Sequence, residues 1–125
     1  MNWDMVREMR SAGMSIGGHT VNHPVLAQTP LHEQSLEIDG CLRRLGEELG
    51  ERTISFSYPV GQLDSFNPET RQCLKTAGVQ FAFSYSGGYQ RFDQWDAYNI
   101  RRVAIEPYIT RDWFRSIVSL PQWLG

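Results

Sequence analysis

The strongest constraint on the fold is a helix pattern that lies between two short strand patterns in the middle of the chain. Residues 53–59, TISFSYP, alternate apolar and polar side chains, which is typical of a strand, and residues 79–86, VQFAFSYS, also read as a strand. Between them, NPETRQCLKTAG begins with the capping residue Asn67 and ends at Gly78, as helices do. This order predicts two parallel strands joined by a crossover helix.

The remaining segments extend the alternation of strands and helices. We expect a helix over residues 3–12 after Asn2, a long helix that begins at Pro30 and ends at Gly50, and a last helix over residues 110–120 capped by Thr110. Further short strands are expected at residues 14–18 and 99–106. The chain is therefore predicted to be one α/β domain over residues 1–125.

Charge and cysteine content exclude several classes of function. The formal net charge is -2 and no basic stripe is present, which argues against a nucleic-acid partner. No apolar run approaches the roughly 20 residues that a membrane span needs, so we expect no membrane insertion. As written, the chain is expected in the cytoplasm, although a longer parent protein could be exported. Cys41 and Cys73 form no CxxC pair and are predicted as small core side chains, with a reactive thiol as the alternative.

Two histidines four residues apart form the candidate metal site. In residues 16–27, IGGHTVNHPVLA, glycines and Pro24 oppose a regular helix, so His19 and His23 are placed on a loop at the end of a strand. Thr20 is expected to steady this loop through its hydroxyl. Zinc binds neutral imidazole at about 2.0–2.1 Å and usually needs a third protein ligand and water. The alternative is that both histidines are structural and only form hydrogen bonds at a turn.

The motif order along the chain resembles a known enzyme family. SAGMSIGGHTVNHPVLA resembles the second signature of the polysaccharide deacetylases, the metal-dependent carbohydrate esterases with the NodB-homology domain, which reads H-[ST]-x-x-H-P. FSYPVG resembles the third signature, a strand that ends in a proline-containing turn before glycine. ETRQCLKTAGVQFAFSYSGG resembles the helix and strand that follow. The resemblance covers nearly the whole chain.

This resemblance implies a fold and a set of site residues. The family fold is a distorted (β/α) barrel, so we expect a partial barrel that lacks the first strands. His19 and His23 match the metal ligands, and the implied cofactor is a divalent metal, zinc. Val60 matches the position whose backbone N–H helps to hold the oxyanion. Tyr58 and Pro59, in the same signature, are the implied substrate-binding residues.

The implied activity is hydrolysis of N-acetyl groups, at non-peptide C–N bonds, on a polysaccharide or oligosaccharide. Two parts of the family's machinery have no match here. The chain contains no Asp-Asp pair, and no histidine follows His32 to act as general acid. We therefore expect activity to be incomplete in this chain alone, with Asp64 and Glu106 as nearby but solvated carboxylates. The alternatives are a non-catalytic remnant that binds carbohydrate or metal, and an interaction domain with structural histidines.

The small number of strands also predicts self-association. About four strands cannot close a barrel that normally uses seven or eight, so sheet edges and part of the core would remain open. A homo-oligomer in which a second copy covers this surface is therefore expected. The candidate surface residues are Trp3, Trp95, Trp113 and Trp123.

Overall fold

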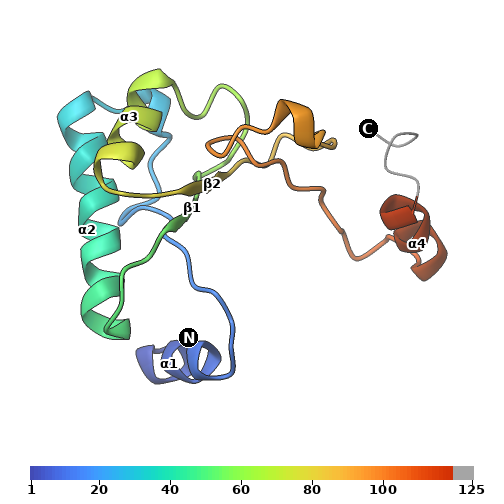
Figure 1. The fold of residues 1–125 in the computed structure, drawn as a ribbon, viewed down its shortest axis with the longest axis horizontal. Helices are drawn as coiled ribbons and strands as arrows, with labels where there is room; N and C mark the ends of the chain where they lie inside the picture. The colour runs from blue at the N-terminus through green and yellow to red at the C-terminus, as the bar shows by residue number, and fades with distance from the viewer. Residues whose placement is uncertain (120–125) are drawn as a thin grey trace.

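The computed structural model describes residues 1–119, apart from the side chain of Phe92. In chain order, the elements are α1 (Trp3–Ser11), a 3-10 helix η1 (Leu26–Gln28), α2 (Leu31–Leu49), β1 (Ser55–Ser57), α3 (Pro68–Thr76), β2 (Phe81–Phe83), a 3-10 helix η2 (Phe92–Gln94) and α4 (Arg111–Ser119) (Figure 1). The strands β1 and β2 are parallel, with Phe56 opposite Ala82. This confirms the predicted strand–helix–strand unit. Trp123 and the end of the last predicted helix lie outside the described residues.

The helix boundaries follow the capping residues in the sequence. Asn67 accepts the Thr70 N–H at 2.9 Å, and the Thr70 hydroxyl accepts the Asn67 N–H at 3.3 Å, which is a reciprocal cap for α3. Asn2 caps α1 by accepting the Met5 N–H at 3.0 Å. Gly50 ends α2 in the left-handed conformation, with φ of 70°. These local signals explain why most predicted helices are confirmed.

The start of α2 differs from the sequence-based expectation by one residue. Pro30 is the residue that precedes the helix rather than its first helical residue, and α2 begins at Leu31. Thr29 belongs to the preceding 3-10 turn, since its hydroxyl donates to the Val25 carbonyl at 3.0 Å. The Thr29 side chain is therefore not available to cap α2.

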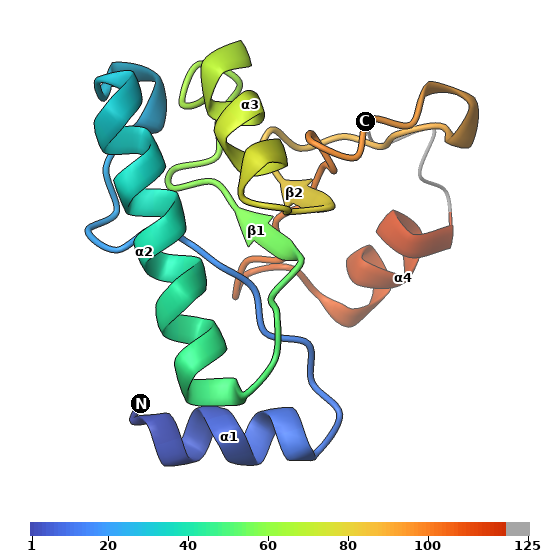
Figure 2. The same cartoon turned by 60° about the vertical axis from the view of Figure 1, so that its left-hand side comes forward.

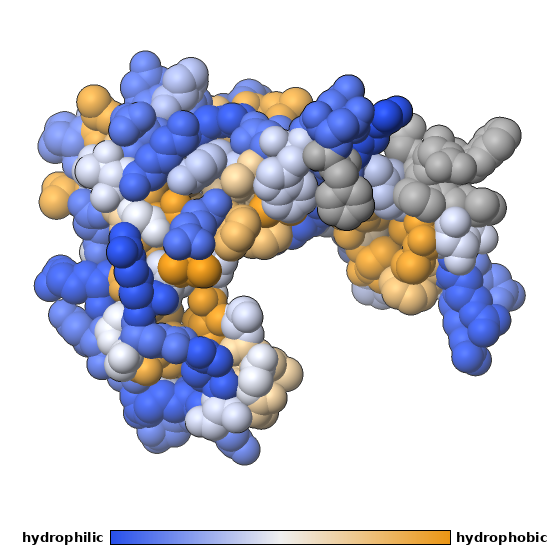
Figure 3. All heavy atoms as spheres, in the orientation of Figure 1, coloured by the Kyte–Doolittle hydropathy of each residue, from blue (hydrophilic) through white to orange (hydrophobic). Residues whose placement is uncertain are grey.

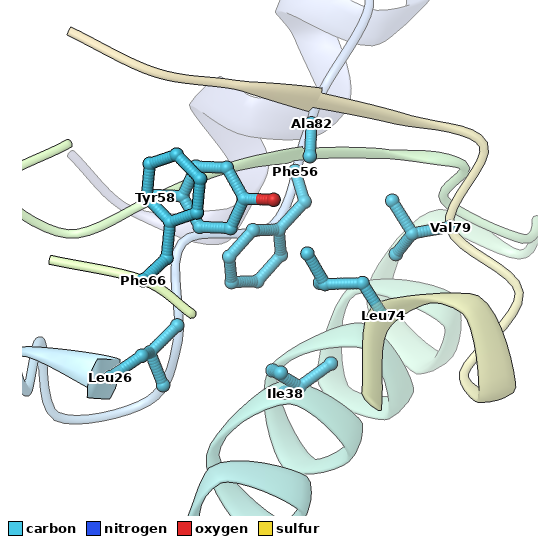
Figure 4. Packing of buried hydrophobic residues seen from close by; sticks show 8 residues of the cluster. All are labelled: Leu26, Ile38, Phe56, Tyr58, Phe66, Leu74, Val79 and Ala82. Carbon is cyan, nitrogen blue, oxygen red and sulfur yellow. The ribbon is translucent and has the colours of Figure 1, made fainter. Parts of the chain in front are cut away.

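A single core forms where α2 and α3 pack against one face of the strands. The two helices lie side by side on that face (Figure 2). Buried apolar side chains from both helices, both strands and the connecting loops meet there (Figure 4), namely Leu26, Ile38, Phe56, Tyr58, Phe66, Leu74, Val79 and Ala82. Full burial of one large apolar side chain contributes about 1.5–3 kcal/mol. This core fixes the strand ends that carry the candidate site.

The segment before β1 is shorter as a strand than expected. Only Gly18 pairs with Phe56 in the predicted strand at residues 14–18. Its backbone N–H donates to Ser55, and its carbonyl accepts from Ser57. The next acceptor in a parallel ladder is the Ser57 carbonyl, but the His19 Nδ1 lies 2.7 Å from that oxygen. The histidine side chain therefore ends the pairing.

The segment after β2 stops pairing in the same way. In the predicted strand at residues 99–106, only Ile100 pairs with Phe83. The following ladder acceptor is the Ser84 carbonyl, and the Arg102 Nε donates to it at 2.9 Å. At both edges, a side chain forms a hydrogen bond with the carbonyl that would otherwise accept the next backbone N–H of the ladder.

The face of the sheet opposite α2 and α3 is open. Ile54 and Phe81 are each 38% exposed there. A hollow of about 760 Å³ extends along this face between the strands and the end of α1, and it is visible as a notch with apolar atoms on its wall (Figure 3). Ion pairs attach α1 to the end of α2, as between Arg7 and Glu48 at 2.6 Å.

No helix within residues 1–119 is both long and apolar enough to cross a membrane.

Candidate functional site

The candidate site is a second, smaller hollow at the C-terminal ends of the strands. Its volume is about 510 Å³. The histidine loop (residues 19–23), the Val60 turn (residues 58–61) and the segment after β2 surround it. The lining residues are His19, His23, Ser57, Tyr58, Val60, Tyr85 and Arg102. The fold therefore brings both predicted metal ligands and the predicted oxyanion position together.

The two imidazole rings of the histidine loop face each other at close range. Their centres are 4.8 Å apart, and the ring planes are inclined by 72°. The Ser57 carbonyl can only accept, so the His19 Nδ1 carries the proton of the 2.7 Å hydrogen bond. In the neutral ring, Nε2 of His19 is then the nitrogen with a free electron pair. Carbonyl contacts of this kind commonly orient histidines that bind metals.

The backbone of the histidine loop is strained. Thr20 has φ of 63° and His23 has φ of 59°, a region that non-glycine residues rarely adopt. The Thr20 hydroxyl accepts the His23 N–H at 3.0 Å and donates to the His19 carbonyl at 2.6 Å. As expected from the sequence, Thr20 therefore steadies the turn that brings the two rings together.

A carboxylate from α2 holds the same loop, and the sequence reasoning missed it. Glu37 accepts the backbone N–H groups of Val21 and Asn22, each at 2.8 Å, and the Asn22 side-chain amide at 2.6 Å. Burial opposes ionisation of Glu37, but the three hydrogen bonds outweigh it and lower the pKa of this carboxyl. Nothing in the local sequence distinguishes Glu37 from a solvated helix residue, so only the packing of α2 beneath the loop shows its role.

The two cysteines behave as structural side chains. Burial raises the pKa of the Cys41 thiol, and Cys41 Sγ accepts the His19 N–H at 3.4 Å. A raised pKa keeps the thiol neutral, which opposes the reactive-thiol alternative. Cys73 packs against the core and contacts the Ser35 hydroxyl at 3.3 Å. Both are free cysteines of intermediate burial.

The Val60 turn lines the hollow. Val60 has φ of 63°, and the Gly61 N–H donates to the Pro59 carbonyl at 2.6 Å, so the chain reverses within three residues. The Tyr85 N–H donates to the Gly61 carbonyl at 2.7 Å and anchors the turn. Within residues 1–119 the Val60 N–H donates to no acceptor. That N–H is therefore available to a ligand.

The side chains of the two predicted substrate-binding residues are buried, although Tyr58 lines the hollow. Tyr58 is 1% exposed, stacks on Phe66 with ring centres 3.9 Å apart, and donates its hydroxyl to the Tyr98 carbonyl at 2.8 Å. Burial strongly raises the pKa of Tyr58, which keeps it a neutral donor. Pro59 is also fully buried. Both side chains pack in the core, so the role of Tyr58 and Pro59 in binding substrate stays a prediction.

The described residues bring two candidate metal ligands, His19 and His23, to this site. Among residues 1–119, no group of three or more histidines, cysteines or carboxylates could hold a metal ion. Of the nearby carboxylates, Asp64 is exposed, and Glu106 accepts the Tyr85 hydroxyl at 3.2 Å. His32 is exposed on the first turn of α2. A third ligand would therefore come from water, from substrate or from residues beyond those described.

Comparison with known proteins decides the family. The model of the polysaccharide deacetylase family matches residues 1–82, which include the histidine loop, the Val60 turn and most of the two-stranded sheet. The chain belongs to the polysaccharide deacetylase family. A Bacillus subtilis (strain 168) protein named as a polysaccharide deacetylase, YxkH, is 26% identical over 116 residues, covering 93% of this chain and 40% of that protein.

Solved structures of deacetylases share the fold. The deacetylase PplD of Streptococcus pyogenes, in complex with acetate, superimposes with a TM-score of 0.84 at 25% identity, covering 93% of this chain and 50% of that one. The polysaccharide deacetylase BC0361 of Bacillus cereus gives a TM-score of 0.80 at 22% identity, covering 95% and 37%. These superpositions confirm an α/β fold of the deacetylase type. The chain spans half or less of the length of these relatives.

Proposed function

We propose that this chain binds a divalent cation, zinc, through His19 and His23, and that the site serves the hydrolysis of N-acetyl groups on a sugar polymer. The paired imidazoles carry this proposal. With metal–nitrogen bonds of about 2.0–2.1 Å, rings whose centres are 4.8 Å apart can share one ion. The His19 Nδ1 contact with Ser57 leaves Nε2 for the metal.

The other residues of the hollow have roles that fit this chemistry. A bound divalent cation would polarise the acetyl carbonyl and lower the pKa of a water molecule. The Val60 N–H, with no partner among the described residues, would donate to an oxyanion. Glu37 and Thr20 hold the histidine loop in its strained form. The residues that line the hollow include no carboxylate that could serve as general base.

Zinc titration of the purified chain tests the proposal. We expect one zinc ion to bind per chain, and His19→Ala and His23→Ala each to abolish binding. His32→Ala is the matched control, because His32 is exposed on α2 and is not part of the hollow. Equal zinc binding by wild type and by the two loop variants would contradict the proposal. Release of acetate from an acetylated chito-oligomer then measures whether the zinc-bound chain is active.

The architecture of the family also motivates a proposal about assembly. We expect the two-stranded sheet to be part of a (β/α) barrel, with the open face at Ile54 and Phe81 covered by further strands or by a second copy of the chain. Trp95 and Trp113, two of the candidate surface residues, are also exposed. Light scattering over a range of protein concentrations measures the self-association, and a monomer at every concentration would contradict the second-copy arrangement.

A further inference from the structure

Arg102 is the charged side chain that lies in the candidate site. It lines the small hollow together with both histidines, and it also lines the larger hollow along the open face. The two hollows share His19, Ser57 and Arg102, so they adjoin one another. A ligand at the histidine pair would therefore meet this guanidinium.

The guanidinium of Arg102, an exposed residue, has two contacts that orient it. Its Nε donates to the Ser84 carbonyl at 2.9 Å, at the point where the pairing with β2 stops. Its central carbon lies 5.6 Å from the centre of the Tyr85 ring, which supports it by a cation–π contact. The Tyr85 backbone is in turn anchored to Gly61 of the Val60 turn at 2.7 Å. The arginine is thus attached to the same framework as the oxyanion position.

The Nη groups of Arg102 have no acidic partner among the described residues. Arg102 forms no ion pair within residues 1–119, whereas Arg7, Arg10, Arg44 and Arg71 each pair with a carboxylate. A guanidinium whose Nε is occupied still has four N–H donors on its two Nη atoms. Planar carboxylates match this donor geometry in a bidentate manner.

The charge around the hollows favours an anionic ligand. The lining of the small hollow contains one arginine and no carboxylate. The larger hollow adds Arg10, Arg52 and Glu51, of which Arg10 and Glu51 pair with each other. Three arginines and one carboxylate line the two hollows, and the Glu106 carboxylate lies beside them at the Tyr85 hydroxyl, whereas the whole chain has a net charge of -2. A concave surface with the sign opposite to that of the whole chain raises the local concentration of anions.

From this geometry we infer that Arg102 is a specificity-determining residue that binds a carboxylate on the substrate, so that the preferred substrate is an acidic N-acetylated sugar rather than a neutral one. The inference rests on the proposed deacetylase function and names the substrate class of that site. An acidic N-acetylated sugar carries a carboxylate and an acetylated amine, and Arg102 and the histidine pair line the same hollow. A free carboxylate such as acetate shares this chemistry.

Three probes distinguish the carboxylate of an acidic sugar from a free carboxylate as the ligand of Arg102. N-acetylmuramic acid carries an acetylated amine and a carboxylate, its methyl ester has nearly the same shape without the charge, and sodium acetate is a carboxylate without a sugar. Binding of each to the zinc-loaded chain is measured by NMR titration. We expect the acid to bind about three- to tenfold more tightly than the ester at low salt, and the difference to shrink as salt is added.

Substitution of neighbouring arginines supplies the matched comparison. Arg102→Gln removes the charge but keeps a side-chain N–H that can still donate to Ser84. It should bind acid and ester equally. Arg102→Lys should keep part of the preference. Arg101→Gln is the control, because Arg101 is exposed, adjacent in sequence and absent from the lining of both hollows. It should keep the full preference.

The outcomes distinguish this inference from the proposed function. Normal zinc binding with no preference for the acid, or a preference that Arg102→Gln leaves unchanged, overturns the role of Arg102 and leaves the metal site intact. Absence of zinc binding together with an Arg102-dependent preference contradicts the metal site and supports the carboxylate subsite. If acetate competes fully with N-acetylmuramic acid and binds as tightly, Arg102 recognises a free carboxylate rather than the acidic sugar, and the substrate assignment is wrong.

Discussion

The histidine loop and the Val60 turn line the same hollow, and both contain non-glycine residues with positive φ, but they are held in different ways. Thr20 and His23 are kept in place by charged and polar hydrogen bonds, chiefly from the Glu37 carboxylate on α2. Val60 is kept in place by packing, since Tyr58 and Pro59 before it are buried and the Gly61 carbonyl is bonded to Tyr85.

This difference has a physical consequence for each element. The hydrogen bonds to the Glu37 carboxylate depend on its ionisation, so they are weakened by low pH or by removal of this one side chain. A turn anchored in the core depends on apolar burial, which changes little with pH. The loop that carries the predicted metal ligands is therefore the more adjustable of the two, and the turn that carries the predicted oxyanion donor is the more rigid.

Removal of the Glu37 carboxylate should have the largest effect on the histidine loop. Glu37→Ala leaves three donors without their acceptor, and we expect a loss of about 1–2 kcal/mol in the free energy of unfolding. Because Glu37 orients the ligands from outside the site, zinc affinity should fall about 10–100-fold. Thermal unfolding and zinc titration measure the two effects.

Two further variants sharpen this prediction. Glu37→Gln keeps one amide oxygen as an acceptor and should restore part of the zinc affinity. Glu47→Ala removes an exposed carboxylate from the same helix, where it only contacts Arg43 at 3.9 Å, and should change neither quantity. Equal zinc affinity in wild type and Glu37→Ala would show that the loop is held by Thr20 and Cys41 alone.

Relief of the strain at Val60 should have a smaller and opposite effect. A β-branched residue at φ of 63° is costly, and glycine adopts this conformation freely. We therefore expect Val60→Gly to raise the free energy of unfolding by about 1 kcal/mol. Denaturant unfolding measures the change. Val103→Gly is the control, since Val103 is also exposed but its φ is not positive, and it should be neutral or destabilising.

The smallest expected effect is a pH response confined to the histidine loop. The pKa of Glu37 is lowered in the folded chain, so its contribution to stability is present above the pKa of the unfolded carboxyl, near 4.5, and is lost as the pH falls through the lower folded value. In NMR spectra the Val21 and Asn22 N–H signals should shift in this range, whereas the Gly61 N–H signal should not. Glu37→Gln should remove the shift. A matching response at Gly61 would mean that the two elements titrate as one unit.

The sequence predicted the elements well where the signals are local. The Asn2 and Asn67 caps and the terminal Gly50 act within one helical turn, so the local sequence is enough to predict them. The HxxxHP motif likewise indicated the family, because its residues are close together along the chain. The two flanking strands were overestimated, because pairing there ends when the side chains of His19 and Arg102 take backbone carbonyls of β1 and of the segment after β2.

The sequence by itself determined the strand–helix–strand order, the helix ends and the pair of histidines, since these depend on residues a few positions apart. Only the tertiary structure decided that Glu37 clamps the histidine loop, that Tyr58 belongs to the core and that Arg102 lines the hollow with the histidines. Each of these contacts joins segments that are distant along the chain, and their energies depend on burial and direction, which a linear pattern does not contain.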